Sequence, residues 1–251
     1  MIGLSSNFRW LLLLVAVSGL LLFTGSSDAG PVVFVFVMAG WVASICIHEF
    51  GHALVAWYGG DHAIPSQGYL TLDPARYVDP VNSLLWPSLL VVIGAFGFPG
   101  GAVYVNVGAL RSDRWRSAVS AAGPLGSLLV FVVLVLPLSL GLDQHLGAPA
   151  FWNAVALLAE LQMVGILLNL LPIPGFDGYG ILEPHLPVDL RRSLEPAKAW
   201  ATLALMAVLV MVPGVGGSFF RAADRITTAM NVDDEMAWDG YRSFRFWRNI
   251  R

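Results

Sequence analysis

Residues 31–58 read PVVFVFVMAGWVASICIHEFGHALVAWY, and this apolar stretch decides the fold class of the chain. A membrane-spanning helix needs about 20 consecutive apolar residues. Residues 31–58 exceed that length, so we predict a span whose last turns, where HEFGH occupies 48–52, approach one membrane face. Ionisable side chains near a bilayer are costly unless they are used. The stretch therefore predicts both a membrane protein and a functional site.

The composition also indicates an integral membrane protein in contact with a lipid bilayer. Of 251 residues, 57% are hydrophobic and 12% are charged. An ordinary soluble domain carries roughly 25% charged residues. The formal net charge of -3 and the lack of a long basic run exclude nucleic acid as an expected partner. The single cysteine, Cys46, excludes an internal disulfide and a cysteine-based zinc cluster.

Other apolar runs extend this prediction along the chain. Residues 84–98 are apolar but short and contain Pro87, so we interpret them as a re-entrant segment. The chain as a whole is expected to be an all-α polytopic membrane protein with about five transmembrane helices. The predicted spans are residues 10–25, 31–58, 118–141, 151–171 and 199–213.

Two stretches alternate between apolar and polar residues, GYLTL at 68–72 and AVYVNVGAL at 102–110. This alternation predicts a small membrane-associated β-element. Either stretch could offer an exposed edge to an extended peptide, or the two could pair with each other as a self-contained sheet. We divide the chain into a transmembrane domain, 1–217, and a tail, 218–251, that is expected to form an amphipathic surface helix.

Lysine and arginine predict the orientation in the membrane, because cytoplasmic loops are enriched in both. The loops GSSDAGP at 25–31 and GLDQHLGAP at 141–149 contain neither. If residues 84–98 do not cross the membrane, most of the remaining positive charges fall on the other side. That side, which we predict to be cytoplasmic, includes the HEFGH end of the second span.

HEFGH places His48 and His52 four residues apart, on one face of a helix and one turn apart. Two imidazoles in this arrangement can bind one zinc ion. Glu49 points about 100° away from His48 and can take a proton from a water that the metal activates. Asp177, just after the fourth span where Pro172 breaks the helix, is a candidate third ligand; the alternative is a solvated aspartate in an ordinary loop.

Two polar residues lie on the predicted fourth span. The Asn169 amide could donate to an oxyanion in the reaction or form an interhelical hydrogen bond. Glu160, in the middle of the span, could support a ligand, line a water path or bond a neighbouring helix. We favour the last of these for Glu160.

Three motifs together resemble the site-2 protease family of intramembrane zinc metalloproteases. They are HEFGH, AAGPLGS at 121–127 and NLLPIPGFDG at 169–178, and the resemblance covers roughly residues 31–190. The stretch GYLTLDPARYVDPVNSLLWP at 68–87 is similar to the compact bacterial branch without PDZ or regulatory domains.

The resemblance implies one zinc per chain, bound by His48, His52 and Asp177. It implies that Glu49 is the catalytic glutamate and that Asn169 supports the reaction intermediate. The implied substrates are single-span membrane proteins of a bacterial cell membrane, cut near the cytoplasmic side to release regulatory proteins or to clear membrane remnants.

The chain departs from the family pattern at three positions. Ser127 replaces a frequent asparagine, Tyr77 replaces a frequent histidine, and Tyr179 replaces the second glycine of DGG. These departures leave the implied ligands and base intact and affect local packing and substrate contacts.

Two other functions were weighed. A catalytically silent membrane scaffold on the same fold is disfavoured by the complete ligand set. A metal transporter needs further ligands along a path, but the remaining histidines, His62, His145 and His185, all fall in predicted loops.

Overall fold

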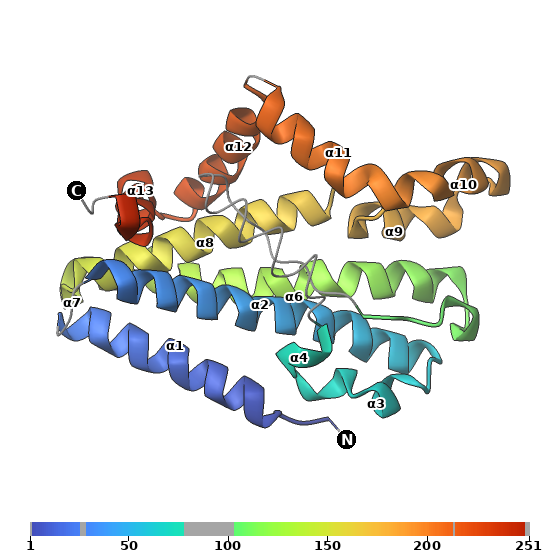
Figure 1. Ribbon diagram of the computed structural model, residues 1–251, viewed down its shortest axis with the longest axis horizontal. Helices are drawn as coiled ribbons and strands as arrows, with labels where there is room; N and C mark the ends of the chain where they lie inside the picture. Colours follow the sequence, from blue (N-terminus) through green and yellow to red (C-terminus); the bar gives the residue numbers. More distant parts are fainter. Residues whose placement is uncertain (1, 26–28, 78–102, 213, 249–251) are drawn as a thin grey trace.

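The structure, a computed structural model, describes residues 2–25, 29–77, 103–212 and 214–248. Every regular element within these ranges is a helix, and no strand occurs among them. Four helices are long and apolar enough to cross a membrane, so the predicted all-α polytopic membrane fold is confirmed (Figure 1). They are α1 (Ser6–Thr24), α2 (Ala29–Gly59), α6 (Asp113–Ser139) and α8 (Pro149–Asn169).

Helix α2 is the centre of this bundle and packs against α1, α6 and α8. Its 31 residues make it about 46 Å long at 1.5 Å per residue, more than the ~30 Å hydrocarbon core. Two glycines let its neighbours come close. A Cβ atom at Gly40 would lie 2.6 Å from Leu158 on α8, and one at Gly51 would lie 2.5 Å from the Ala122 carbonyl oxygen on α6. Membrane helices associate by such close packing of small residues.

Prolines set both ends of α8. Pro149 stands in its first turn, where a missing N–H costs nothing, and the helix ends at Asn169, just before Pro172 and Pro174. The predicted helix break is therefore confirmed. A short turn then leads into α9, which begins at Asp177 (Asp177–Leu182).

Helix α11 (Lys198–Met211) occupies most of the predicted fifth span, 199–213. Its 14 residues give a length of about 21 Å, which is less than the ~30 Å hydrocarbon core. Within the described part of the chain, the full-length spans therefore number four, and α11 is too short to cross a membrane by itself.

The C-terminal tail folds back onto the bundle. Helices α12 (Val215–Ala229) and α13 (Asp234–Phe244) both pack against α8, and α13 also contacts α2. The buried residues of α12, which are Gly216, Ala223 and Thr227, recur on one face of the helix. The tail thus contains most of α12 and the whole of α13. Each of these helices buries one face against the bundle, whereas the sequence predicted one surface helix.

The predicted β-element is wrong for the described residues. GYLTL is a 3₁₀ helix over Tyr69–Thr71, bounded by left-handed residues at Gly68 (φ 81°) and Leu72 (φ 52°), which a strand cannot contain. Residues 103–106 are extended, but no described strand pairs with them. The predicted re-entrant segment, 84–98, lies outside the described residues.

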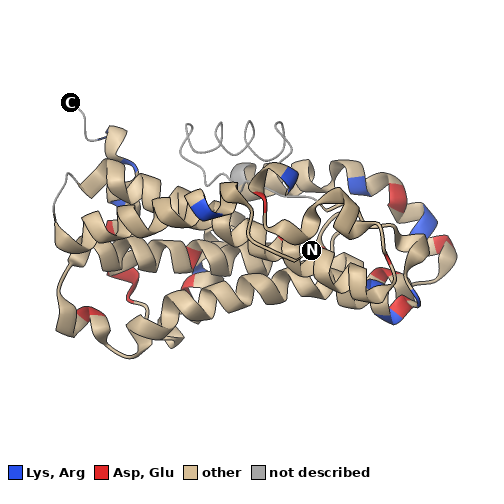
Figure 2. Cartoon of the chain, turned by 90° about the horizontal axis from the view of Figure 1, so that it is seen from below, with Lys and Arg blue, Asp and Glu red and all other residues tan. Residues whose placement is uncertain are grey.

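Short helices surround the ends of the bundle. Charged residues gather most densely along the chain at one end of the bundle (Figure 2), which is the end that carries α10 and the start of α6 in Figure 1. The cytoplasmic assignment of this end stays a prediction. The remaining short helices are α3 (Ile64–Gln67), α4 (Pro74–Tyr77), α7 (Leu142–Leu146), α10 (Val188–Leu194) and the 3₁₀ turns Val107–Ala109, Glu183–His185, Glu195–Ala197 and Phe246–Arg248.

Candidate metal centre

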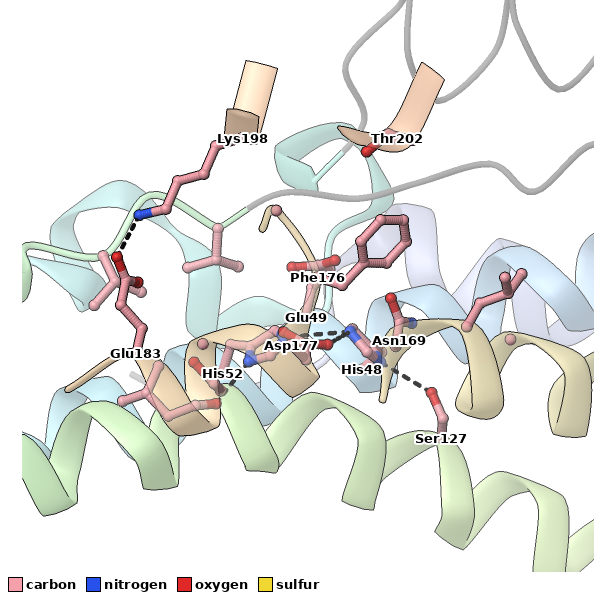
Figure 3. A pocket seen from close by; sticks show the side chains of 18 of the residues that line it. His48, Glu49, His52, Ser127, Asn169, Phe176, Asp177, Glu183, Lys198 and Thr202 are labelled. Carbon is pink, nitrogen blue, oxygen red and sulfur yellow. Dashed lines mark hydrogen bonds and ion pairs between the residues drawn. The ribbon is translucent and has the colours of Figure 1, made fainter. Parts of the chain in front are cut away.

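Three side chains meet between α2 and α9 (Figure 3). The Nε2 atoms of His48 and His52 are 3.1 Å apart, as expected for residues one helical turn apart. One carboxylate oxygen of Asp177, Oδ2, lies 3.1 Å from His48 Nε2. The other, Oδ1, lies 3.3 Å from His52 Nε2. Two imidazoles and a carboxylate match the His₂–carboxylate donor set of catalytic zinc sites. The structure therefore brings together the three residues that the sequence proposed as ligands.

Glycines allow Asp177 to reach α2. Gly175 has a φ of 96°, which turns the chain back toward the end of α8. A Cβ atom at Gly178 would lie 2.2 Å from the Leu170 carbonyl oxygen, so α9 can pack here only without a side chain at that position. The PIPGFDG stretch therefore forms a tight reversal that points the carboxylate at the histidines, and not a solvated loop.

Helix α6 supplies the outer partners of both histidines. His48 Nδ1 lies 3.0 Å from Ser127 Oγ, and His52 Nδ1 lies 2.7 Å from the Val119 carbonyl oxygen. A carbonyl can only accept, so His52 carries a proton on Nδ1, which leaves Nε2 as the atom that can bind a metal. Outer partners of this kind orient metal-binding histidines and fix their tautomers. The sequence marked Ser127 only as a departure from a family pattern, and nothing in it marked the Val119 carbonyl.

The backbone of α6 forms one wall of the centre at Gly123. A Cβ atom there would lie 2.2 Å from His52 Nε2 and 2.6 Å from His48 Nε2. These distances are far below van der Waals contact. Glycine at this position is therefore a requirement of the site.

Burial alone raises the pKa of the Asp177 carboxyl, but its hydrogen bonds with His48 and His52 outweigh burial and hold the pKa at about 2. The group is therefore a carboxylate throughout the neutral range. Metal ligation requires this ionised form.

Glu49 and Asn169 lie beside the three candidate ligands. Glu49 is 5% exposed, and its carboxylate accepts a hydrogen bond from the backbone N–H of Val103. Both side chains line the same cavity, and Figure 3 shows Asn169 on the His48 side of the group. The structure thus places the candidate base and the candidate oxyanion donor within one site.

The cavity over the centre has a volume of about 1120 Å³. Helices α2, α6, α8, α9 and α11 line it, together with Val103, Val105 and Val107. Near its opening, Lys198 Nζ lies 2.7 Å from Glu183 and 2.9 Å from Glu195. These contacts link the first turn of α11 to the segment after α9. This volume is slightly above the range of about 300–1,000 Å³ that is usual for ligand pockets. The cavity is therefore large enough to hold several residues of a peptide.

A buried carboxylate that the sequence did not predict fixes the extended residues. Asp61 is 2% exposed; it accepts hydrogen bonds from the backbone N–H groups of Ala63 at 3.1 Å and of Asn106 at 2.8 Å. The only signal in the sequence was an aspartate after the two glycines that end α2. Asp61 thereby joins the end of α2 to the cavity wall.

Glu160 lies apart from this site. Glu160 does not line the cavity. The two alternatives in which it supports a ligand or lines a water path into this cavity are therefore disfavoured. Its acidic neighbours are Asp224 and Asp234, on the tail side of α8. Among the described residues, its carboxylate has no hydrogen-bond partner, so the predicted interhelical bond is not found.

Comparison with known proteins gives close relatives over most of the chain. The chain is 40% identical over 250 residues to a Mycolicibacterium smegmatis protein named "Putative zinc metalloprotease Rip2", covering 97% of this chain and 94% of the relative. It is 43% identical over 247 residues to the protein of that name from Mycobacterium tuberculosis H37Rv, with the same coverage. It is 30% identical over 178 residues to "Putative zinc metalloprotease YwhC" of Bacillus subtilis, covering 67% of this chain and 77% of YwhC. No protein-family model and no solved structure matches the chain.

Proposed function

This chain belongs to the zinc metalloprotease family that includes Rip2 and YwhC, and from this premise we propose that it is an intramembrane endopeptidase of the site-2 protease type. One observation carries the proposal. His48 and His52 lie on α2, a helix long enough to span a membrane, and Asp177 reaches them from α9. The cavity beside the three residues is lined by the spanning helices α2, α6 and α8 and by shorter segments.

The residues around the centre suit hydrolysis of a peptide bond. His48, His52 and Asp177 would hold a zinc ion, which would act as a Lewis acid and make water acidic enough to react near neutral pH. Glu49, buried beside the ligands, accepts the proton of the attacking water and passes it to the leaving amine. The Asn169 amide donates to the oxygen of the scissile carbonyl as negative charge develops there.

The substrate is expected to bind as an extended chain. A helical peptide keeps its carbonyls within its own hydrogen bonds, so a single-span substrate must unwind locally to be cut. Val103, Val105 and Val107 line the cavity, whereas Tyr104 between them is 74% exposed. This alternation makes residues 103–106 the better candidate for pairing with a substrate strand, since GYLTL is helical and Val107 begins a 3₁₀ turn.

We further propose a bacterial cell membrane as the location, with the centre near the cytoplasmic side. The support is the absence of lysine and arginine from the loops 25–31 and 141–149. The expected outcome of cleavage is release of a regulatory protein or removal of a membrane remnant. The orientation is tested by labelling single cysteines, placed in loop 141–149 and at the start of α6, with a reagent that does not cross the membrane. We expect labelling from outside the cell in the loop only. Labelling of the α6 position from outside would mean that the orientation is the opposite of the one proposed.

Cleavage by the purified protein tests the main proposal. The protein in detergent is assayed for zinc and incubated with a panel of single-span substrates. We expect about one zinc per chain, cleavage by the wild type, and loss of cleavage with retention of zinc in Glu49→Gln. Glu160→Gln is the matched control, because Glu160 is a half-buried glutamate on a spanning helix outside the cavity. Zinc-loaded protein without Glu49-dependent cleavage across a broad panel would favour the silent scaffold instead.

A further inference from the structure

A buried polar pair lies in the cavity wall and takes no part in the proposed zinc chemistry. The Ser44 hydroxyl on α2 donates to Oε1 of Gln162 on α8 over 2.6 Å. Both side chains are 3% exposed and both line the cavity. Ser44 stands halfway along α2, one turn before His48, and Gln162 stands two turns before Asn169 on α8. The pair is therefore deeper in the bundle than the candidate zinc ligands, on the same wall.

The bond to Ser44 uses only part of the hydrogen-bonding capacity of Gln162. A carboxamide has one oxygen and two N–H donors. The oxygen is held by Ser44, whereas the described part of the chain provides no hydrogen-bond partner for the side-chain nitrogen. Gln162 lines the cavity, so its two N–H donors are available to an acceptor that enters the cavity.

An unwound substrate supplies the missing acceptor. Its backbone carbonyls lose their helical partners, and in a cavity within the membrane each unpaired carbonyl is costly. Building on the proposed function, we propose that Gln162, oriented by Ser44, binds a backbone carbonyl of the extended transmembrane substrate. This contact recognises the unwound backbone and not a side chain.

The position of the pair predicts which carbonyl is bound. Four residues of α2 separate Ser44 from His48, which is about 6 Å along the helix axis. An extended peptide advances about 3.3 Å per residue. The bound carbonyl is therefore expected roughly two residues from the scissile bond, on the side toward the membrane centre.

Synthetic single-span peptides with backbone esters test this contact. Each amide near the scissile bond is replaced in turn by an ester, whose carbonyl is a weaker acceptor, and kcat and KM are measured for the zinc-loaded protein. For the all-amide peptide, Gln162→Met is expected to raise KM roughly three- to tenfold, the effect of one lost hydrogen bond, with a smaller change in kcat. The ester about two residues from the cut should raise KM for the wild type but not for Gln162→Met.

Three controls separate binding from a structural effect. Gln144→Met makes the same substitution on exposed α7 and should behave as the wild type. Ser44→Ala keeps both amide donors but frees their orientation, so we expect a KM between those of the wild type and Gln162→Met. If Gln162→Met loses zinc, Ser44→Ala replaces it in the ester comparison. In Ser44→Ala, the ester about two residues from the cut should raise KM less than it does in the wild type.

The inference would be overturned if the ester at each position had the same effect on KM in the wild type and in both variants. The contact between Ser44 and Gln162 would then be one of helix packing only. In that outcome Glu49-dependent cleavage persists, so the proposed function survives. Loss of that cleavage in the wild type itself would overturn both.

Discussion

The Nδ1 atom of His52 on α2 lies 2.7 Å from the backbone carbonyl oxygen of Val119 on α6. The contact joins residues 67 positions apart and leaves Nε2 facing Asp177. The packing of α6 against α2 thus holds a proton on Nδ1 of a candidate zinc ligand and orients its ring. His48 also contacts α6, through the Ser127 hydroxyl, which can donate or accept.

Ser127→Ala should weaken zinc binding by about 10- to 100-fold, because it removes the outer partner of His48. Competition with a zinc chelator of known affinity measures the change. Ser127→Asn restores a polar partner and should bind zinc more tightly than Ser127→Ala. Ser193→Ala, on exposed α10, is the control. Equal affinity of Ser127→Ala and wild type would show that the Ser127 contact does not support the ligand.

Asp177→Ala should weaken zinc binding by more than about 100-fold, the upper end of what loss of an outer partner costs. The reason is that Asp177 approaches both histidines and is held as a carboxylate. The same chelator competition measures the loss, and Asp143→Ala on α7 is the control. Unchanged affinity would remove Asp177 from the ligand set.

Gly123→Ala should lower the zinc content well below one per chain. On helix propensity alone, alanine is favoured over glycine by roughly 1 kcal/mol. The opposite result is expected here, because the new methyl group would lie 2.2 Å from His52 Nε2. Gly217→Ala on α12 is a matched control, since its nearest neighbour is the flexible end of Arg221. Elemental analysis of both variants decides the point; a zinc-replete Gly123→Ala protein would contradict the close approach of α6.

Lys198→Met should loosen α11, observed as faster backbone hydrogen exchange over residues 198–211. Burial lowers the pKa of Lys198, but hydrogen bonds and charges from Glu183 and Glu195 outweigh burial and raise it. A raised lysine pKa gives stability that is fully present below the unfolded pKa of about 10.4 and is lost as pH rises through the folded pKa. The ratio of the exchange rates of variant and wild type over residues 198–211 should therefore be the same at pH 6 and at pH 9.

The two glutamates that contact Lys198 make this prediction sharper. Glu183 is 24% exposed and Glu195 is 64% exposed, and exposed ion pairs contribute little. Glu183→Gln should therefore speed exchange in α11 more than Glu195→Gln does. The reverse order, or an effect of Lys198→Met that disappears at pH 9, would show that α11 is held by other contacts.

The sequence by itself determined four of the five predicted membrane helices, the break after α8 and the pairing of His48 with His52. Each of these follows from residues close together along the chain. Apolar length sets a span, proline stops a helix, and a four-residue spacing puts two side chains on one face. The same local reasoning failed at GYLTL, where left-handed residues at Gly68 and Leu72 replace the predicted strand by a 3₁₀ turn.

Only the tertiary structure decided how these pieces meet. The contacts of His52 with Val119, of Asp61 with Asn106 and of Ser44 with Gln162 join residues 45 to 118 positions apart. No pattern along the chain encodes them, because they depend on which helix faces pack and how closely. Small residues such as Gly51 and Gly123 set that closeness. The candidate zinc ligands were thus visible in the sequence, whereas the groups that orient them and line the cavity emerged only from helix packing.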